Sequence, residues 1–206
     1  MEEPVEMVIP QPYLGFIRNP FRFIGAHESF LLGSFIILLT GFVGSLTNTH
    51  FDGVLDIHTG AAGPLWVFLA PGFLNWLSLA VPLYLAGWIV SGRRIRAGDV
   101  LGYEAFARTP MLVAVLFTLI PAFQRQVLQP SVFTGDTIAF AVVLLVILGM
   151  IVLMVVWMYK GFARAARRGG GKSITAFIVA LVVGEIISKA AFYYFILPSA
   201  ALPQLP

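Results

Sequence analysis

Five long apolar stretches, separated by short polar or basic segments, make up most of this 206-residue chain. A bilayer's hydrocarbon core takes about 20 helical residues to cross, and the apolar stretches are close to this length without alternating as strands do. Because lipid offers the backbone no hydrogen-bond partner, such stretches must be helical. The pattern therefore predicts an all-α fold, an integral membrane bundle of five transmembrane helices, at about 29–47, 73–90, 104–122, 137–159 and 173–197.

Proline residues interrupt two of the five apolar stretches. Pro71, followed by Gly72, predicts a short helix at 65–70 that is separate from the second span, because proline removes a helical hydrogen bond. Pro110 and Pro121 likewise predict that the third span is short or kinked.

Lys and Arg residues are concentrated in alternate gaps between the spans, where they form a basic face. Since basic residues favour the cytoplasmic side of a membrane, their distribution predicts a cytoplasmic N-terminus and an external C-terminus. The same residues are expected to contact anionic lipid headgroups. They are Arg93, Arg94 and Arg96 between the second and third spans, and Arg164, Arg167, Arg168 and Lys172 between the fourth and fifth.

The domain organisation follows from these spans. Residues 1–27 are predicted to be a cytoplasmic N-terminal segment, with an interfacial amphipathic stretch at 12–27 where aromatic residues alternate with Arg. Residues 28–197 form the membrane domain, and 198–206 form a short external tail.

Composition narrows the functional class. Charged residues make up 11% of the chain, against about 25% in soluble domains. Without a soluble domain to carry a groove, nucleic acid is not an expected partner; the expected partners are the lipid bilayer, a membrane protein or a second copy of the chain. The absence of cysteine excludes disulfides and thiolate sites. No catalytic set is present, so neither an enzyme nor a cofactor is predicted.

Glu185 and Lys189 are ionisable residues within the predicted fifth span. They lie four residues apart and so share one helix face. Ionisable groups inside a membrane usually mark functional sites, although an ion pair that holds the bundle together is the alternative. Asn75 in the second span could join this intramembrane polar site. Ala176, Ala180, Gly184 and Ser188 form a small-residue stripe on the same span, which predicts close packing with another helix.

Two further polar groups have weaker signals. Glu104 and Arg108 are spaced for a salt bridge at the inner end of the third span. An outer loop contains His50, Asp52, Asp56 and His58, whose side chains could bind Zn²⁺ or a similar ion. This spacing matches no standard ligand motif, so a solvated polar loop is predicted and no metal site.

The segment from Ser91 to Pro110 reads SGRRIRAGDVLGYEAFARTP, a basic loop that leads through a short helix to the proline of the third span. This segment resembles the signature region of the Yip (Ypt/Rab-interacting protein) domain family. Residues 19–24 resemble the lead-in of its bacterial members, and 157–189 resemble its last two spans. The resemblance implies a prokaryotic-type, five-span member, in a family whose eukaryotic members bind prenylated small GTPases during vesicle trafficking. It rests mainly on Gly98, Gly102, Tyr103 and Pro110.

Two functions stay open at this level. The first is a non-enzymatic, trafficking-like membrane protein that organises partners or lipids through its basic face. The alternative is a small transporter or lipid-translocating protein with a polar site around Glu185 and Lys189. In either case the expected location is a membrane, crossed several times, and the cytoplasmic (inner) membrane if the source is prokaryotic.

Overall fold

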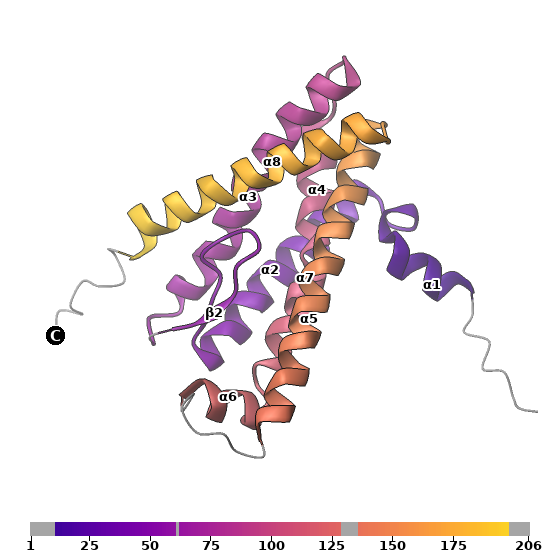
Figure 1. Ribbon diagram of the computed structural model, residues 1–206. Coiled ribbons are helices and arrows are strands. Elements are labelled where there is room, and N and C mark those ends of the chain that lie inside the picture. Colours follow the sequence, from indigo (N-terminus) through magenta and orange to yellow (C-terminus); the bar gives the residue numbers. More distant parts are fainter. Residues whose placement is uncertain (1–10, 61, 129–135, 198–206) are drawn as a thin grey trace, which may run out of the picture.

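The computed structural model describes residues 11–60, 62–128 and 136–197. Within these ranges five helical stretches are long and apolar enough to cross a membrane, which confirms the predicted all-α, five-span class. Figure 1 shows the elements, which are α1 (Gln11–Arg18), η1 (Pro20–Arg22), α2 (Ala26–Thr47), β1 (Thr49–His50), β2 (His58–Thr59), α3 (Trp66–Ser91), α4 (Ala97–Ala107), α5 (Thr109–Phe117), α6 (Pro121–Leu128), α7 (Asp136–Ala166), α8 (Gly171–Ala191) and the π-helix η2 (Phe192–Ile196).

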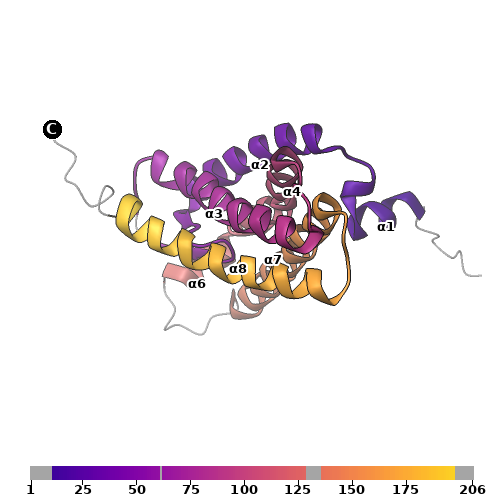
Figure 2. The same ribbon diagram turned by 90° about the horizontal axis from the view of Figure 1, so that it is seen from above.

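The stretch formed by α4 and α5 is the most deeply buried of the five and forms the centre of the bundle. Helices α2, α3 and α7 pack around α4, whereas α8 packs mainly on α3 (Figure 2). Gly184 on α8 allows this contact, because a Cβ there would lie 3.0 Å from the Cα of Leu79 and 3.1 Å from the carbonyl of Ser78. The small-residue stripe thus packs a helix closely, as predicted.

Helix α3 runs without a break from Trp66 to Ser91, so the prediction of a separate helix before Pro71 is wrong. Pro71 and Pro82 both lie inside α3 and are buried against the bundle. A proline removes only one donor, and tertiary packing around a transmembrane helix can compensate for the loss. The tertiary contacts therefore override the local signal.

The third span begins at Ala97, well before the predicted start at residue 104. Its predicted interruption is confirmed: α4 ends at Ala107 and α5 begins at Thr109, with Pro110 in the first turn. Pro110 has no N–H to donate to the carbonyl of Phe106, and the Thr109 hydroxyl donates to that carbonyl instead, at 2.6 Å. The Thr109 side chain thus replaces the backbone hydrogen bond that Pro110 cannot make.

Helix α7 continues to Ala166, beyond the predicted end at residue 159. Lys and Arg are good helix formers, and their charge is favoured at a helix C-terminus, so the helix does not stop where the apolar run stops. Arg164 therefore lies on the helix, in its last turn.

The N-terminal helices lie beside the bundle (Figure 1). Trp157 on α7 fastens them by donating its indole N–H to the carbonyl of Ile17, at 2.7 Å. Phe21 in η1 is fully buried against Tyr103 and Phe106 of α4. Tyr13 remains exposed. Within the predicted interfacial stretch, Phe21 is therefore part of the core, while α1 exposes Tyr13.

The segment between α2 and α3 folds back onto the bundle, so the prediction of a solvated loop is wrong for His50, which is buried, whereas Asp56 and His58 remain about half exposed. Strands β1 and β2 pair antiparallel, with His50 opposite His58. Between them, Phe51 and Val54 are 5% and 0% exposed and belong to the main core. Burial of these two apolar side chains holds the loop against the bundle, while Asp52, Asp56 and His58 stay partly exposed.

Candidate functional site

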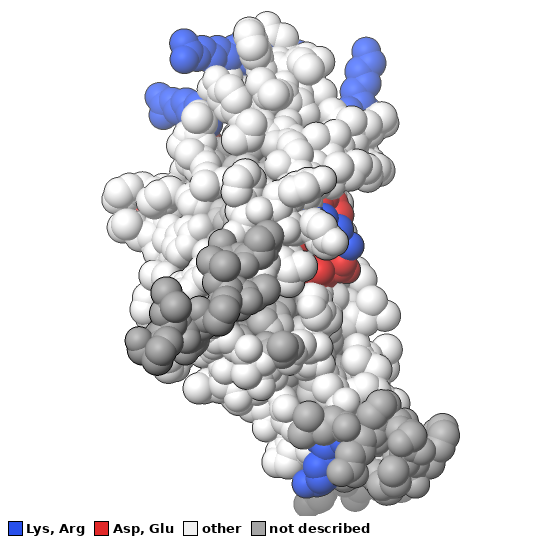
Figure 3. Space-filling view, turned by 90° about the vertical axis from the view of Figure 1, so that its left-hand side faces the viewer, with Lys and Arg blue, Asp and Glu red and all other residues white. Residues whose placement is uncertain are grey.

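Basic side chains gather around a cavity of about 250 Å³ where α3 ends, α4 begins and α7 ends. We call this part of the molecule the basic end. On the face in Figure 3, several Lys and Arg side chains project at the upper end, and the surface below them is mostly uncharged apart from one patch of acidic and basic side chains at mid-height and basic side chains at the lower end. The cavity is lined by Arg93, Arg94, Ile95, Arg96, Asp99, Ala165 and Arg167.

The turn from α3 to α4 positions three of these arginines. Gly92 ends α3 in the left-handed conformation, with φ of 65°, and the Ser91 hydroxyl donates to the carbonyl of Arg93 at 2.8 Å. Ile95 is buried and packs where Gly87 of α3 leaves room, since a Cβ on Gly87 would lie 2.6 Å from the Ile95 Cδ1. With Ile95 anchored, the three exposed arginines beside it are held at the mouth of the cavity.

Arg167 approaches from the other side. It follows the last residue of α7 and has a positive φ of 50°, which is strained for a residue with a side chain. The N–H of Arg168 donates to the carbonyl of Ala163 at 3.1 Å and closes this turn. Two segments distant in sequence thus place four arginines in the lining of one cavity.

The remaining residues of the predicted basic face lie outside the cavity lining. The Arg164 Nε donates to the Tyr103 hydroxyl at 3.0 Å, and its guanidinium lies 5.8 Å from the centre of that ring. Arg168 and Lys172 are exposed. Asp99, which sequence reasoning did not single out, adds a carboxylate to the lining. Its position in the first turn of α4 was the available signal.

The residues that carry the family resemblance have packing roles. Gly102 lies so close to α2 that a Cβ would collide with the carbonyl oxygen of Ala26, whereas Gly98 has open space around it. Tyr103 is buried between Phe21 and Arg164. Pro110 starts α5 and is buried.

The predicted polar site forms at the loop between α2 and α3. Asn75 is fully buried and donates both hydrogens of its amide, at 2.8 Å each, to the carbonyls of Phe51 and Gly53. A carboxylate oxygen of Glu185 accepts from the N–H of Leu55 at 3.1 Å. Both side chains therefore hydrogen-bond to the same loop, one from α3 and the other from the neighbouring α8.

Lys189 adds an ion pair to the same loop at the protein surface. Its ammonium group pairs with Asp56 and lies 3.6 Å from a carboxylate oxygen of Glu185. The structure thus brings Asn75, Glu185 and Lys189 to one loop, where each has a protein partner.

The side chains that could have bound a metal ion each contact a different group. His58 hydrogen-bonds to Asp52 at 3.1 Å, His50 stacks on Phe68 with ring centres 4.5 Å apart, and Asp56 pairs with Lys189. Among the described residues, no group of three or more His, Cys, Asp or Glu could hold a metal ion.

The predicted salt bridge between Glu104 and Arg108 is wrong. Both side chains are buried, at 1% and 6% exposure, and no hydrogen bond joins them. Because the helix starts at Ala97, Glu104 lies about 10 Å inside the bundle along the helix axis, at 1.5 Å per residue, and not at its end.

Comparison with protein-family models, curated proteins and solved structures found no match for this chain.

Proposed function

We propose that this protein is a non-enzymatic membrane protein that binds anionic phospholipid headgroups in the cavity at its basic end, which faces the cytoplasm. The observation that carries this proposal is the cavity of about 250 Å³ lined by four arginines and one aspartate. A basic residue near an anionic membrane surface contributes about 1 kcal/mol of attraction. Four arginines around one cavity add geometric selectivity to that attraction.

Arginine suits this role better than a general positive charge would. Its planar guanidinium can donate two parallel hydrogen bonds to a phosphate group, which fixes the orientation of the headgroup. Asp99 supplies an acceptor in the same cavity. An acceptor beside several donors matches a headgroup that carries hydroxyls as well as phosphate, such as a glycerol or inositol phospholipid.

The geometry gives less support to a transporter with its site at Glu185 and Lys189. Glu185 accepts a hydrogen bond from the loop, and Lys189 pairs with Asp56. A substrate would have to displace both contacts and release the loop. The polar site is better explained as the attachment of that loop.

Lipid binding can be tested by titrating the purified, detergent-solubilised protein with short-chain phosphatidylglycerol and phosphatidylinositol phosphate, against phosphatidylcholine, by native mass spectrometry. The wild type should prefer the anionic lipids. The triple variant Arg93→Gln, Arg94→Gln, Arg96→Gln should lose tenfold or more in affinity for them, since about 1.4 kcal/mol is a factor of ten.

The matched control removes three exposed basic residues that are not in the cavity lining: Arg18→Gln, Arg22→Gln, Arg168→Gln. This variant has the same net charge as the first and should keep the preference for anionic lipids. Equal loss in both variants would show that the chain attracts lipid by overall charge, and the assignment to the cavity would then fail. A membrane-protein partner that competes with lipid would extend the proposal.

A further inference from the structure

A second polar group lies deep in the bundle, at the break between α4 and α5. Both carboxylate oxygens of Glu104 and two guanidinium nitrogens of Arg108, Nε and Nη2, are buried without a hydrogen-bond partner. Buried polar groups nearly always have such partners, and buried charges are costly without them. Neither residue is needed for lipid binding at the basic end, so the pair calls for an explanation of its own.

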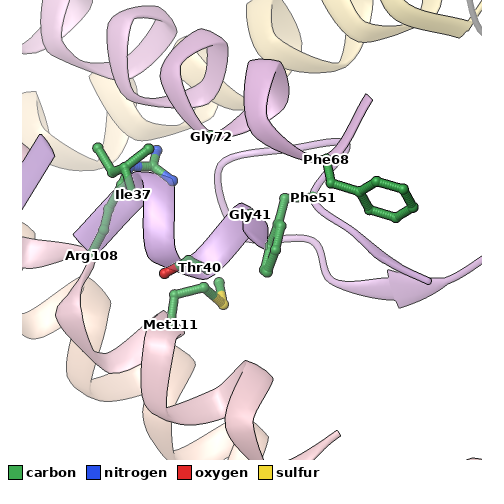
Figure 4. A pocket seen from close by; sticks show the side chains of 8 residues that line it. All are labelled: Ile37, Thr40, Gly41, Phe51, Phe68, Gly72, Arg108 and Met111. Carbon is green, nitrogen blue, oxygen red and sulfur yellow. The ribbon is translucent and has the colours of Figure 1, made fainter. Parts of the chain in front are cut away.

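Arg108 reaches a small cavity on one side of the break. Figure 4 shows its guanidinium next to Ile37 of α2, with Thr40 of α2 and Met111 of α5 lower in the view, and all four residues line the cavity. The cavity has a volume of about 20 Å³, and a cavity of at least about 10–15 Å³ can hold one water molecule. Arg108 therefore lines a space that fits a single water.

The donors and acceptors around this cavity favour water over an anion. The Thr40 hydroxyl donates its hydrogen to the carbonyl of Ile36 at 2.7 Å, so only oxygen lone pairs remain to face the cavity. Water can accept from Arg108 and donate to Thr40, whereas an anion would be repelled by the same lone pairs. A bound water would satisfy Arg108 but leave Glu104 unpaired.

Among the described residues, Arg108 is the charged group nearest in effect to Glu104. Its carboxylate faces Gly161 on α7, where a Cβ would lie 3.5 Å from Oε1, and Arg108 attracts it from its own helical stretch. Arg164, the nearby cation of α7, is bonded to Tyr103. Helix α2 packs against α4 where Gly33 meets Ala105, and its buried polar residue in this region, Ser29, is neutral.

Helix α3 is the third neighbour of α4. Its polar contact with α4 is neutral: the indole N–H of Trp76 donates to the carbonyl of Leu101. The acidic residue of α8, Glu185, accepts a hydrogen bond from the N–H of Leu55 in the loop between α2 and α3. Among the described residues, Arg108 is thus the cation that stabilises an ionised Glu104, without a hydrogen bond, while a protonated Glu104 avoids the cost of a buried charge.

We propose that Glu104 is a proton-binding site inside the membrane domain, poised between Arg108 and its apolar surroundings, with Arg108 solvated by one water in the cavity at the helix break. On protonation, a hydronium ion loses one O–H bond and becomes water while the new O–H bond forms on the Glu104 carboxylate, and the reverse step returns the proton to water. No oxidation or reduction accompanies this exchange.

Infrared spectroscopy of the protein in nanodiscs can follow this exchange, because a protonated carboxyl has a C=O stretching band that an ionised one lacks. The wild type should show a band that disappears with rising pH. Glu104→Gln, which keeps the size of the side chain, should remove that band, whereas the control Glu28→Gln, at an exposed position, should keep it.

Arg108→Met provides a second measurement in a protein that retains Glu104. Loss of the positive charge should move the titration midpoint of the band to higher pH by about one unit or more, the usual effect of a nearby opposite charge. The proposal is overturned if the band does not titrate in the wild type, or if its midpoint is unchanged in Arg108→Met. Lipid affinity is measured separately, so failure here leaves the lipid-binding proposal standing.

Discussion

Removing the side-chain amide of Asn75 is the sharpest test of how the loop between α2 and α3 is held. Asn75 lies on α3 and donates to the carbonyls of Phe51 and Gly53. The substitution Asn75→Ala deletes both hydrogen bonds and leaves both carbonyls without this partner. It changes no formal charge, so the effect is confined to hydrogen bonding and packing.

The size of the loss follows from the two bonds. A hydrogen bond in a soluble protein contributes about 0.5–1.5 kcal/mol, and one between transmembrane helices about 0.6 kcal/mol on average. The transmembrane value is low because unfolded helices find other partners in the membrane. Here the acceptors belong to a loop, which would return to water when released. We therefore expect Asn75→Ala to cost about 1–3 kcal/mol.

Reversible unfolding in mixed micelles measures this free energy, and limited proteolysis measures exposure of the loop. Leu77→Ala is the matched control, because Leu77 lies on the same helix but is 46% exposed. Asn75→Ala should be less stable than the control and should be cut faster within 48–63. If the two variants have equal stability and equal cleavage, the amide does not hold the loop.

Two other substitutions test the packing and the surface ion pair. Gly102→Ala places a methyl group against the carbonyl of Ala26 and should lower the free energy of unfolding by about 1–3 kcal/mol, whereas Gly98→Ala, in open space, should not; equal effects would contradict the close contact. Lys189→Met removes the half-exposed ion pair with Asp56 and should cost less than about 1 kcal/mol, a difference that shrinks as salt is added to the unfolding assay. A larger or salt-independent loss would mean that Lys189 does more than pair with Asp56.

Local patterns predicted the spans better than their ends. The apolar stretches identified five crossing helices because length and hydropathy are properties of neighbouring residues. The ends differed where tertiary contacts intervened. Pro71 sits inside a continuous α3, and α4 begins at Ala97 within a segment that reads as a polar loop. Each of these helices is held by its neighbours in the bundle.

The sequence identified several residues of the candidate sites but not the contacts that those residues make. Asn75, Glu185 and Lys189 were recognised because polar groups are rare in apolar spans. Their common partner, the loop around Gly53, was not predicted, since two apolar residues such as Phe51 and Val54 do not by themselves show that a loop is buried. Glu104 and Arg108 have the spacing of an ion pair, yet their charged atoms are unpaired because the helix breaks at Arg108.

The sequence by itself determined that this chain is a five-span membrane protein with basic residues in alternate gaps, because both depend only on which residues follow one another. The tertiary structure decided which of those basic residues surround one cavity, what Glu185 binds, and that Glu104 is buried without a partner. These outcomes depend on contacts between segments far apart in the chain. The basic face predicted from the loops is thus resolved into four arginines around one cavity, with Arg164 turned toward Tyr103.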